Sequence, residues 1–113
     1  AVLSRTQSLE TLIFDEVDAG IGGATSEKVG QKIKQLSDRH QVICITHLAQ
    51  IAKYGNRHFR IFKEVVDDRT STRIIPLTDP SGRIEEIARM IGGTDISKTT
   101  LTHAEEMLAH VST

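Results

Sequence analysis

The chain has 113 residues, enough for one small domain with a modest core, and we expect a single domain over residues 1–113. Apolar residues make up 38% of it, aromatic residues only 4%, and Trp is absent, so the core must be mostly aliphatic. Fourteen basic side chains nearly balance fifteen acidic ones, so no net field favours nucleic acid or a membrane surface. No apolar stretch approaches the roughly 20 residues of a membrane span, and no membrane partner is expected.

A short buried strand followed by carboxylates is the strongest local signal. Leu12–Phe14 is a continuous apolar run, which is typical of a strand covered on both faces. Asp15 and Glu16 follow at once, then Asp18 and a glycine-containing loop that reaches Gly23. Adjacent ionised carboxylates at the mouth of a low-dielectric core are best tolerated when a cation or strong donors offset them. Mg²⁺ suits such oxygen ligands, and the second carboxylate is then free to orient or deprotonate a water.

A helix and a second strand come next. Residues 25–39 carry apolar side chains at helical spacing, and Val42–Ile45 is another apolar run without polar alternation. This order predicts a parallel βαβ unit with both strands buried. Parallel strands joined by a helix end at the same edge of the sheet. The carboxylates should therefore share that edge with Thr46 and His47, where open α/β sheets bind their ligands.

The glycines and the remaining histidines are less informative. The P-loop spacing G-x-x-x-x-G-K-[ST] is absent, and the dinucleotide fingerprint fails because Thr25 stands where its third glycine belongs. Cys44 lies inside the second strand and is interpreted as an inert core residue, which agrees with a reducing compartment. Four histidines lack metal-ligand spacing and are interpreted as structural or surface residues: His40, His58, His103 and His110.

The second half of the chain predicts a hairpin and two helices. "RHFRIFKEVV" and "TSTRIIPL" flank a polar "DDR" turn and alternate as antiparallel strands do, and Pro76 suits a strand end. An amphipathic helix should begin near Asp79 and stop at Gly92-Gly93, with Ile84, Ile87, Ala88 and Ile91 on its apolar face. A last helix should begin after a cap at Ser97 and bury Leu101, Ala104 and Leu108.

Several strings of the chain together resemble one known family. "TLIFDEVDAGIGG", then a helix, then "QVICITHLAQIA" closely resembles the second half of the ATPase head of the bacterial RecN family of SMC-like DNA repair proteins. "HFRIFKE", "RIEEIARMIGG" and "TLTHAEEMLA" resemble the remainder of that head, so the resemblance covers nearly all of the chain from Thr11 onward. The implied fold is α/β. It is the C-terminal lobe of an ABC/SMC-type P-loop NTPase head, with mostly parallel buried strands, flanking helices, a C-terminal β-hairpin and two helices.

The resemblance implies a role for each residue at the sheet edge. Asp15 corresponds to the Walker B aspartate, which holds Mg²⁺ on the phosphates of ATP. Glu16 matches the catalytic glutamate that orients or activates the attacking water. His47 matches the switch histidine, which is expected to contact the γ-phosphate, and Thr46 beside it is a weaker candidate for nucleotide contact.

The loop after the carboxylates falls on a motif that acts between two heads. Asp18, Ala19 and Gly20 match the D-loop, which in the family reaches across an ATP-sandwiched pair of heads. The family's Walker A loop and signature motif are not among these 113 residues. In the family most of the phosphate-binding donors come from the N-terminal lobe of the head. We therefore expect this chain by itself neither to bind ATP tightly nor to hydrolyse it.

The resemblance also implies partners and a location for the whole protein. These are the N-terminal lobe of its own head with a coiled coil, a second head, DNA and recombination proteins. The process is double-strand-break repair and recombination, and the place is the bacterial cytoplasm, in association with the nucleoid. The near-balanced charge gives no reason to place a DNA site on this chain.

Two other functions compete with this interpretation. A metal-dependent phosphoesterase or nuclease would use Asp15, Glu16 and Asp18 as metal ligands. It would need ligands from further strands, and no second acidic cluster stands at a predicted strand end, since Asp67-Asp68 falls in a hairpin turn. A non-catalytic interaction module would instead use the hairpin and the terminal helices as docking surface.

Overall fold

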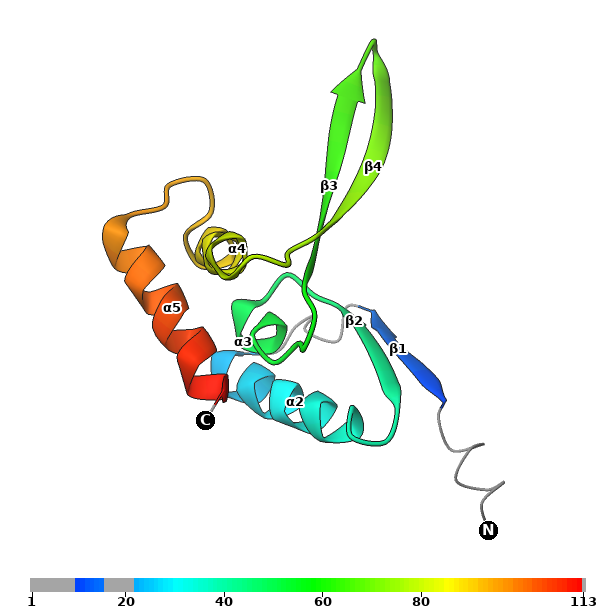
Figure 1. Cartoon of the computed structure of the whole chain (residues 1–113), viewed down its shortest axis with the longest axis vertical. Coiled ribbons are helices and arrows are strands. Elements are labelled where there is room, and N and C mark those ends of the chain that lie inside the picture. Colours follow the sequence, from blue (N-terminus) through cyan, green and yellow to red (C-terminus); the bar gives the residue numbers. More distant parts are fainter. Residues whose placement is uncertain (1–9, 16–21, 113) are drawn as a thin grey trace. The chain divides into compact units, whose positions relative to one another are not determined.

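The computed structural model describes residues 10–15 and 22–112 and divides into two compact units, residues 1–55 and 56–113 (Figure 1). The expectation of a single domain over residues 1–113 stays a prediction. Within the described ranges, no helix has both the length and the apolar character that crossing a membrane requires.

The first unit is built on a parallel pair of strands. β1 (Thr11–Asp15) and β2 (Gln41–Ile45) pair in parallel, and α2 (Gly23–Leu36) connects them (Figure 1). The register places Thr11 opposite Gln41 and Asp15 opposite Ile45. The predicted parallel βαβ unit is therefore confirmed, and its two strands end level with each other.

The prediction that both faces of these strands are buried is wrong for the described chain. Side chains alternate along each strand between partly buried and exposed. Phe14 on the covered face lines an apolar groove together with α2, whereas Ile13, Ile43 and Ile45 on the other face are 67%, 45% and 43% exposed. A continuous apolar run indicates that both faces avoid water, but it does not say which part of a protein covers them. Among the described residues of this unit (10–15 and 22–55), a helix covers only one face of the sheet.

A short helix that the sequence did not predict follows β2. α3 (Ala49–Ala52) has only four residues, too few for any helical periodicity to show. Ala49 and Ile51 are each 3% exposed, so this short helix is firmly packed.

The second unit begins with the predicted hairpin. β3 (Phe59–Val66) pairs antiparallel with β4 (Arg69–Pro76), and the hairpin extends away from the two helices of the unit (Figure 1). The two turn residues Asp67 and Asp68 have φ of 51° and 62°, as a two-residue type I′ turn requires. Pro76 ends the second strand as expected, where its missing N–H costs no ladder bond.

Both predicted C-terminal helices are also present. α4 (Pro80–Gly92) begins after the cap residue Asp79 with Pro at its first position, and it ends at Gly93, whose φ of 71° suits glycine. α5 (Lys98–Ser112) follows Ser97, whose Oγ accepts the backbone N–H of Thr100 at 3.1 Å. The core of this unit consists of side chains with no exposed surface: Ile87, Ala88 and Ala104.

Candidate functional site

The register of β1 and β2 brings two of the predicted site segments to one edge. Asp15 ends β1 opposite Ile45, which ends β2, and Thr46 and His47 follow directly. The Asp15 side chain is exposed and, by strand alternation, lies on the open face with Ile13. Asp15, Thr46 and His47 are therefore the predicted site residues that the described chain brings together at the carboxyl edge.

The other predicted site residues lie outside the described ranges. These are Glu16, Asp18, Ala19 and Gly20. Their assignment to catalysis and to the D-loop stays a prediction.

A local turn shapes the segment that carries His47. The hydroxyl of Thr46 accepts a hydrogen bond from the backbone N–H of Leu48 at 3.1 Å, which closes a turn around His47. Thr46 is half-buried, and His47 is exposed. Thr46 therefore lies at the carboxyl edge of the sheet and also stabilises the backbone turn through its hydroxyl. The imidazole of His47 lies on the surface.

Three residues that sequence analysis did not single out join α3 to α2. Glu27 on α2 accepts a hydrogen bond from the Tyr54 hydroxyl at 2.5 Å and forms an ion pair with Lys53 Nζ at 2.8 Å. Burial, and then the hydrogen bond to Glu27, raise the pKa of Tyr54 above its usual value of 10.0. No local sequence pattern could predict these contacts, because Glu27 and Tyr54 are 27 residues apart in sequence.

The comparisons with known proteins point to one protein. No family model matches the chain. It is 45% identical over 108 residues to the DNA repair protein RecN of Haemophilus influenzae and 41% identical over 108 residues to RecN of Bacillus subtilis. These alignments cover 95% and 96% of this chain. The chain is homologous to a segment of RecN. It spans 19% of the length of each of these two relatives.

A solved structure supports the fold of this RecN-like segment. A chain from a structural study of SMC ATPases, titled for their ATP-driven dimerization and DNA-stimulated activation, aligns with a TM-score of 0.50. The alignment covers 75% of this chain and 52% of that one, at 22% sequence identity. At that identity the likeness concerns the fold alone.

The side chains at the RecN-like edge are compatible with a divalent cation. Mg²⁺ in nucleotide sites is usually held by one or two carboxylates together with substrate phosphates, so Asp15 alone suffices as a protein carboxylate. Over residues 10–15 and 22–112 no group of three or more His, Cys, Asp or Glu side chains could form a metal cage.

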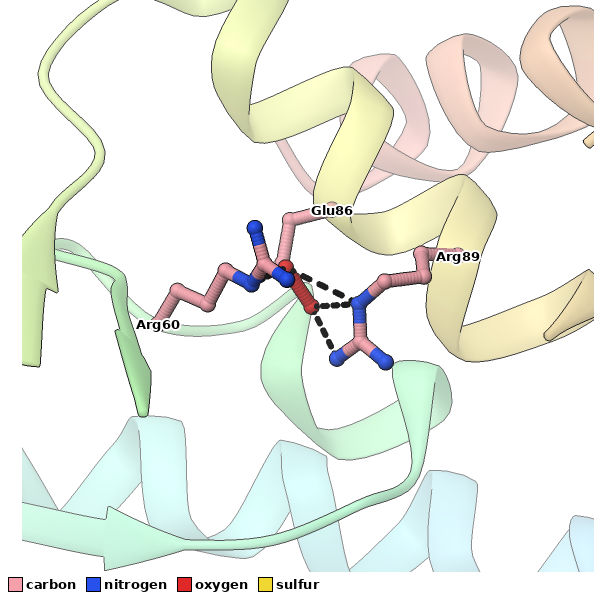
Figure 2. A network of polar contacts seen from close by, with 3 residues as sticks. All are labelled: Arg60, Glu86 and Arg89. Atoms are coloured by element: carbon pink, nitrogen blue, oxygen red, sulfur yellow. Dashed lines mark hydrogen bonds and ion pairs between the residues drawn. The ribbon is translucent and has the colours of Figure 1, made fainter. Parts of the chain in front are cut away.

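A second polar cluster lies in the unit of residues 56–113. Glu86 on α4 is only 5% exposed, and the guanidinium groups of Arg60 and Arg89 approach its carboxylate from two sides (Figure 2). Arg60 Nε lies 3.3 Å and Arg89 Nε 2.7 Å from Glu86 oxygens. Burial, and then Arg83, lower the pKa of nearby His58 below 6.5, although Glu86 acts in the opposite direction. Because Arg60 belongs to β3 and Arg89 to α4, we interpret the cluster as holding the hairpin to the helix.

Proposed function

We propose that this chain forms part of the ATP-hydrolysing head of a RecN-type DNA repair protein. The observation that carries the proposal is the parallel pairing of β1 and β2, because it sets Asp15 and the Thr46–His47 turn at one sheet edge. Homology to RecN supports DNA repair as the process, and the SMC ATPase fold supports ATP as the nucleotide.

Each of the proposed site residues has a separate task in this proposal. Asp15 would hold Mg²⁺, and the ion would neutralise charge on the phosphates. Glu16 orients the attacking water and accepts its proton. His47 donates a hydrogen bond to the terminal phosphate, and the hydroxyl of Thr46 keeps the turn that presents it.

The proposed site is completed by protein parts that lie outside this chain. Asp18, Ala19 and Gly20 contribute to contact with a second head, and the phosphate cradle belongs to the N-terminal lobe. The chain by itself is therefore inactive, and Mg²⁺-dependent ATP turnover by the purified 113-residue chain would contradict this part of the proposal. The whole protein acts in the bacterial cytoplasm on DNA, together with recombination proteins.

The test uses a full-length RecN-type polypeptide that carries this segment. Glu16→Gln should lower kcat by roughly 10²- to 10⁴-fold while nucleotide still binds, because a general base contributes about that much. Asp15→Asn should weaken Mg²⁺-dependent nucleotide binding, and His47→Ala should lower kcat. Glu64→Gln is the matched control, since it removes a carboxylate from an exposed ion pair on the hairpin. An unchanged kcat for ATP hydrolysis in both Glu16→Gln and His47→Ala would contradict the proposal.

A second function is favoured by one observation for the chain taken alone. Ile13, Ile43 and Ile45 expose an apolar sheet face, which is typical of a surface that another protein part covers. As an interaction module, the chain would bind the N-terminal lobe of its own head through this face. Co-purification of the two separately expressed parts measures this, and it should be lost when Ile43 is replaced by Lys. Metal-dependent cleavage of a phosphodiester without ATP would instead support the phosphoesterase alternative.

A further inference from the structure

Both oxygens of the Glu27 carboxylate are engaged by residues at the end of α3. Oε1 accepts the hydroxyl of Tyr54 at 2.5 Å, and Oε2 lies 2.8 Å from Lys53 Nζ. The Lys53 ammonium also lies 5.3 Å from the centroid of the Tyr54 ring. We refer to Glu27, Lys53 and Tyr54 as the Glu27 cluster.

The Glu27 cluster differs from an ordinary surface ion pair in its burial. The Lys53 side chain is 8% exposed and that of Glu27 is 30% exposed, whereas the Arg73–Glu64 pair on the hairpin is 56% and 41% exposed. An ammonium group so far removed from water needs a fixed counter-charge, and Glu27 supplies it. Removing that carboxylate therefore costs far more than removing one from an exposed pair.

The backbone of α2 approaches α3 closely beside the Glu27 cluster. A Cβ atom added at Gly30 would lie 2.6 Å from Cδ2 of Tyr54 and 3.0 Å from the backbone oxygen of Gln50. Only glycine leaves room for this approach. α2 and α3 are thus joined by polar contacts at Glu27, and one turn further along α2 they pack closely at Gly30.

Short-range hydrogen bonds link the Glu27 cluster to the turn that carries His47. Lys53 N–H donates to the Ala49 carbonyl at 3.0 Å, and Ala52 N–H donates to the Leu48 carbonyl at 3.0 Å. Leu48 N–H in turn donates to Thr46 Oγ1 at 3.1 Å. A four-residue helix has no stability of its own in water, so its position depends on what anchors it.

α2 in turn contacts the strand that ends at Asp15. Phe14, the residue before Asp15, lines one groove with Val29 and Ile33 of α2. α2 therefore shares a groove with the end of β1 and also makes the contacts to the end of α3.

We propose that Glu27, Lys53 and Tyr54 are positioning residues that hold the His47 turn at a fixed place relative to Asp15, by fastening α3 to α2. The inference rests on the proposed role of His47 in hydrolysis. None of the three touches the nucleotide in this proposal. They act through the backbone between Thr46 and Tyr54, so their loss should affect the chemical step more than nucleotide binding.

The test again uses a full-length RecN-type polypeptide that carries this segment. Glu27→Gln should lower kcat about tenfold, equivalent to ~1.4 kcal/mol in the barrier, with KM for ATP changed less than about threefold. Tyr54→Phe removes a single hydroxyl with little risk to folding, and kcat should fall about three- to tenfold. The double variant Glu27→Gln/Lys53→Met should recover part of the loss, because it no longer leaves a buried ammonium without its counter-charge.

A second readout follows the His47 turn directly. Hydrogen exchange of the backbone amides over residues 46–54 should speed up in Glu27→Gln and Tyr54→Phe. Glu64→Gln serves as control, and it should leave both kcat and this exchange unchanged. Faster exchange with wild-type kcat in both variants would show a purely structural role and overturn the inference. Wild-type exchange and wild-type kcat would overturn it as well.

The variant His47→Ala separates failure of the inference from failure of the proposed function. If His47→Ala lowers kcat and the Glu27 and Tyr54 variants do not, the positioning role is wrong and the proposed site stands. If His47→Ala leaves kcat unchanged, the role of the histidine is wrong, and the inference falls with it.

Discussion

At the scale of single residues, Gly30 leaves almost no room for a side chain. Gly30→Ala should destabilise the first unit by about 1–3 kcal/mol, because the new methyl group would overlap the ring of Tyr54. Gly82 is the matched control. It lies in α4 with nothing within 4 Å of an added Cβ, so Gly82→Ala should stabilise its own unit by up to ~1 kcal/mol.

Urea unfolding of the two glycine variants measures both effects. The chain has one Tyr and no Trp, so tyrosine fluorescence reports Tyr54 and hence the first unit. Circular dichroism follows the helices of the second unit. Equal shifts of the same sign in both variants would contradict the close approach at Gly30.

His58 should make the stability of the second unit depend on pH. Burial and Arg83 lower its pKa below 6.5, so the folded chain binds this proton less tightly than the unfolded chain does. The free energy of unfolding should therefore fall as the pH drops through 6.5 and level off below the lowered pKa of the folded state. Both forms are neutral above 6.5, and there the contribution is constant.

Replacing His58 tests the direction of this change of unfolding free energy with pH. His58→Gln should flatten the decrease in unfolding free energy over that range, whereas His103→Gln on the exposed surface of α5 should leave the decrease in place. Denaturant midpoints at a series of pH values provide the measurement. A steeper fall in His58→Gln would mean that the imidazole gains a proton on folding, which is opposite to the effect that burial and Arg83 should have.

At the scale of elements, Glu86 joins the hairpin to α4. Glu86→Gln should destabilise the second unit by about 2–3 kcal/mol, because a nearly buried carboxylate loses charge-assisted bonds to two arginines at once (Figure 2). Glu64→Gln removes one exposed pair with Arg73 and should cost at most ~0.5 kcal/mol. Thermal unfolding of the two variants gives the comparison, and equal losses would argue against a joining role for Glu86.

Elements that depend on local sequence were predictable. The apolar runs indicated β1 and β2, the alternation around "DDR" indicated the hairpin, and Ser97 indicated the start of α5. The common edge of Asp15 and His47 followed from strand-helix-strand order alone, because parallel strands joined by a crossover must end together.

Features that depend on contacts between distant residues were not predictable. α3 is too short for periodicity, and the residues at its end contact Glu27, which lies more than twenty residues earlier in the chain. The Glu86 cluster likewise joins α4 to Arg60 of a strand. Burial on both faces of β1 was overestimated for a related reason, since apolar side chains show that a face avoids water without showing what covers it.

At the scale of the molecule, the β1–β2 sheet exposes one apolar face. Ile13 and Ile43 are opposite each other in the register and are 67% and 45% exposed, although parallel sheets are normally covered on both sides. The chain spans 19% of the length of its RecN relatives from Haemophilus influenzae and Bacillus subtilis. We therefore expect this face to behave differently in the chain alone and in a full-length RecN-type polypeptide.

Ile43→Thr tests that expectation while keeping a β-branched side chain that suits a strand. In the 113-residue chain the change should alter stability by less than about 0.5 kcal/mol and reduce self-association, because Ile43 is already exposed. In a full-length RecN-type polypeptide it should destabilise the head by about 1–3 kcal/mol, because the isoleucine would be buried there. Val42→Thr on the face toward α2 should instead be destabilising in both contexts. Denaturant unfolding and sedimentation of each variant in each context measure the difference, and an equal effect of Ile43→Thr in the two contexts would mean that no further part of the head covers this face.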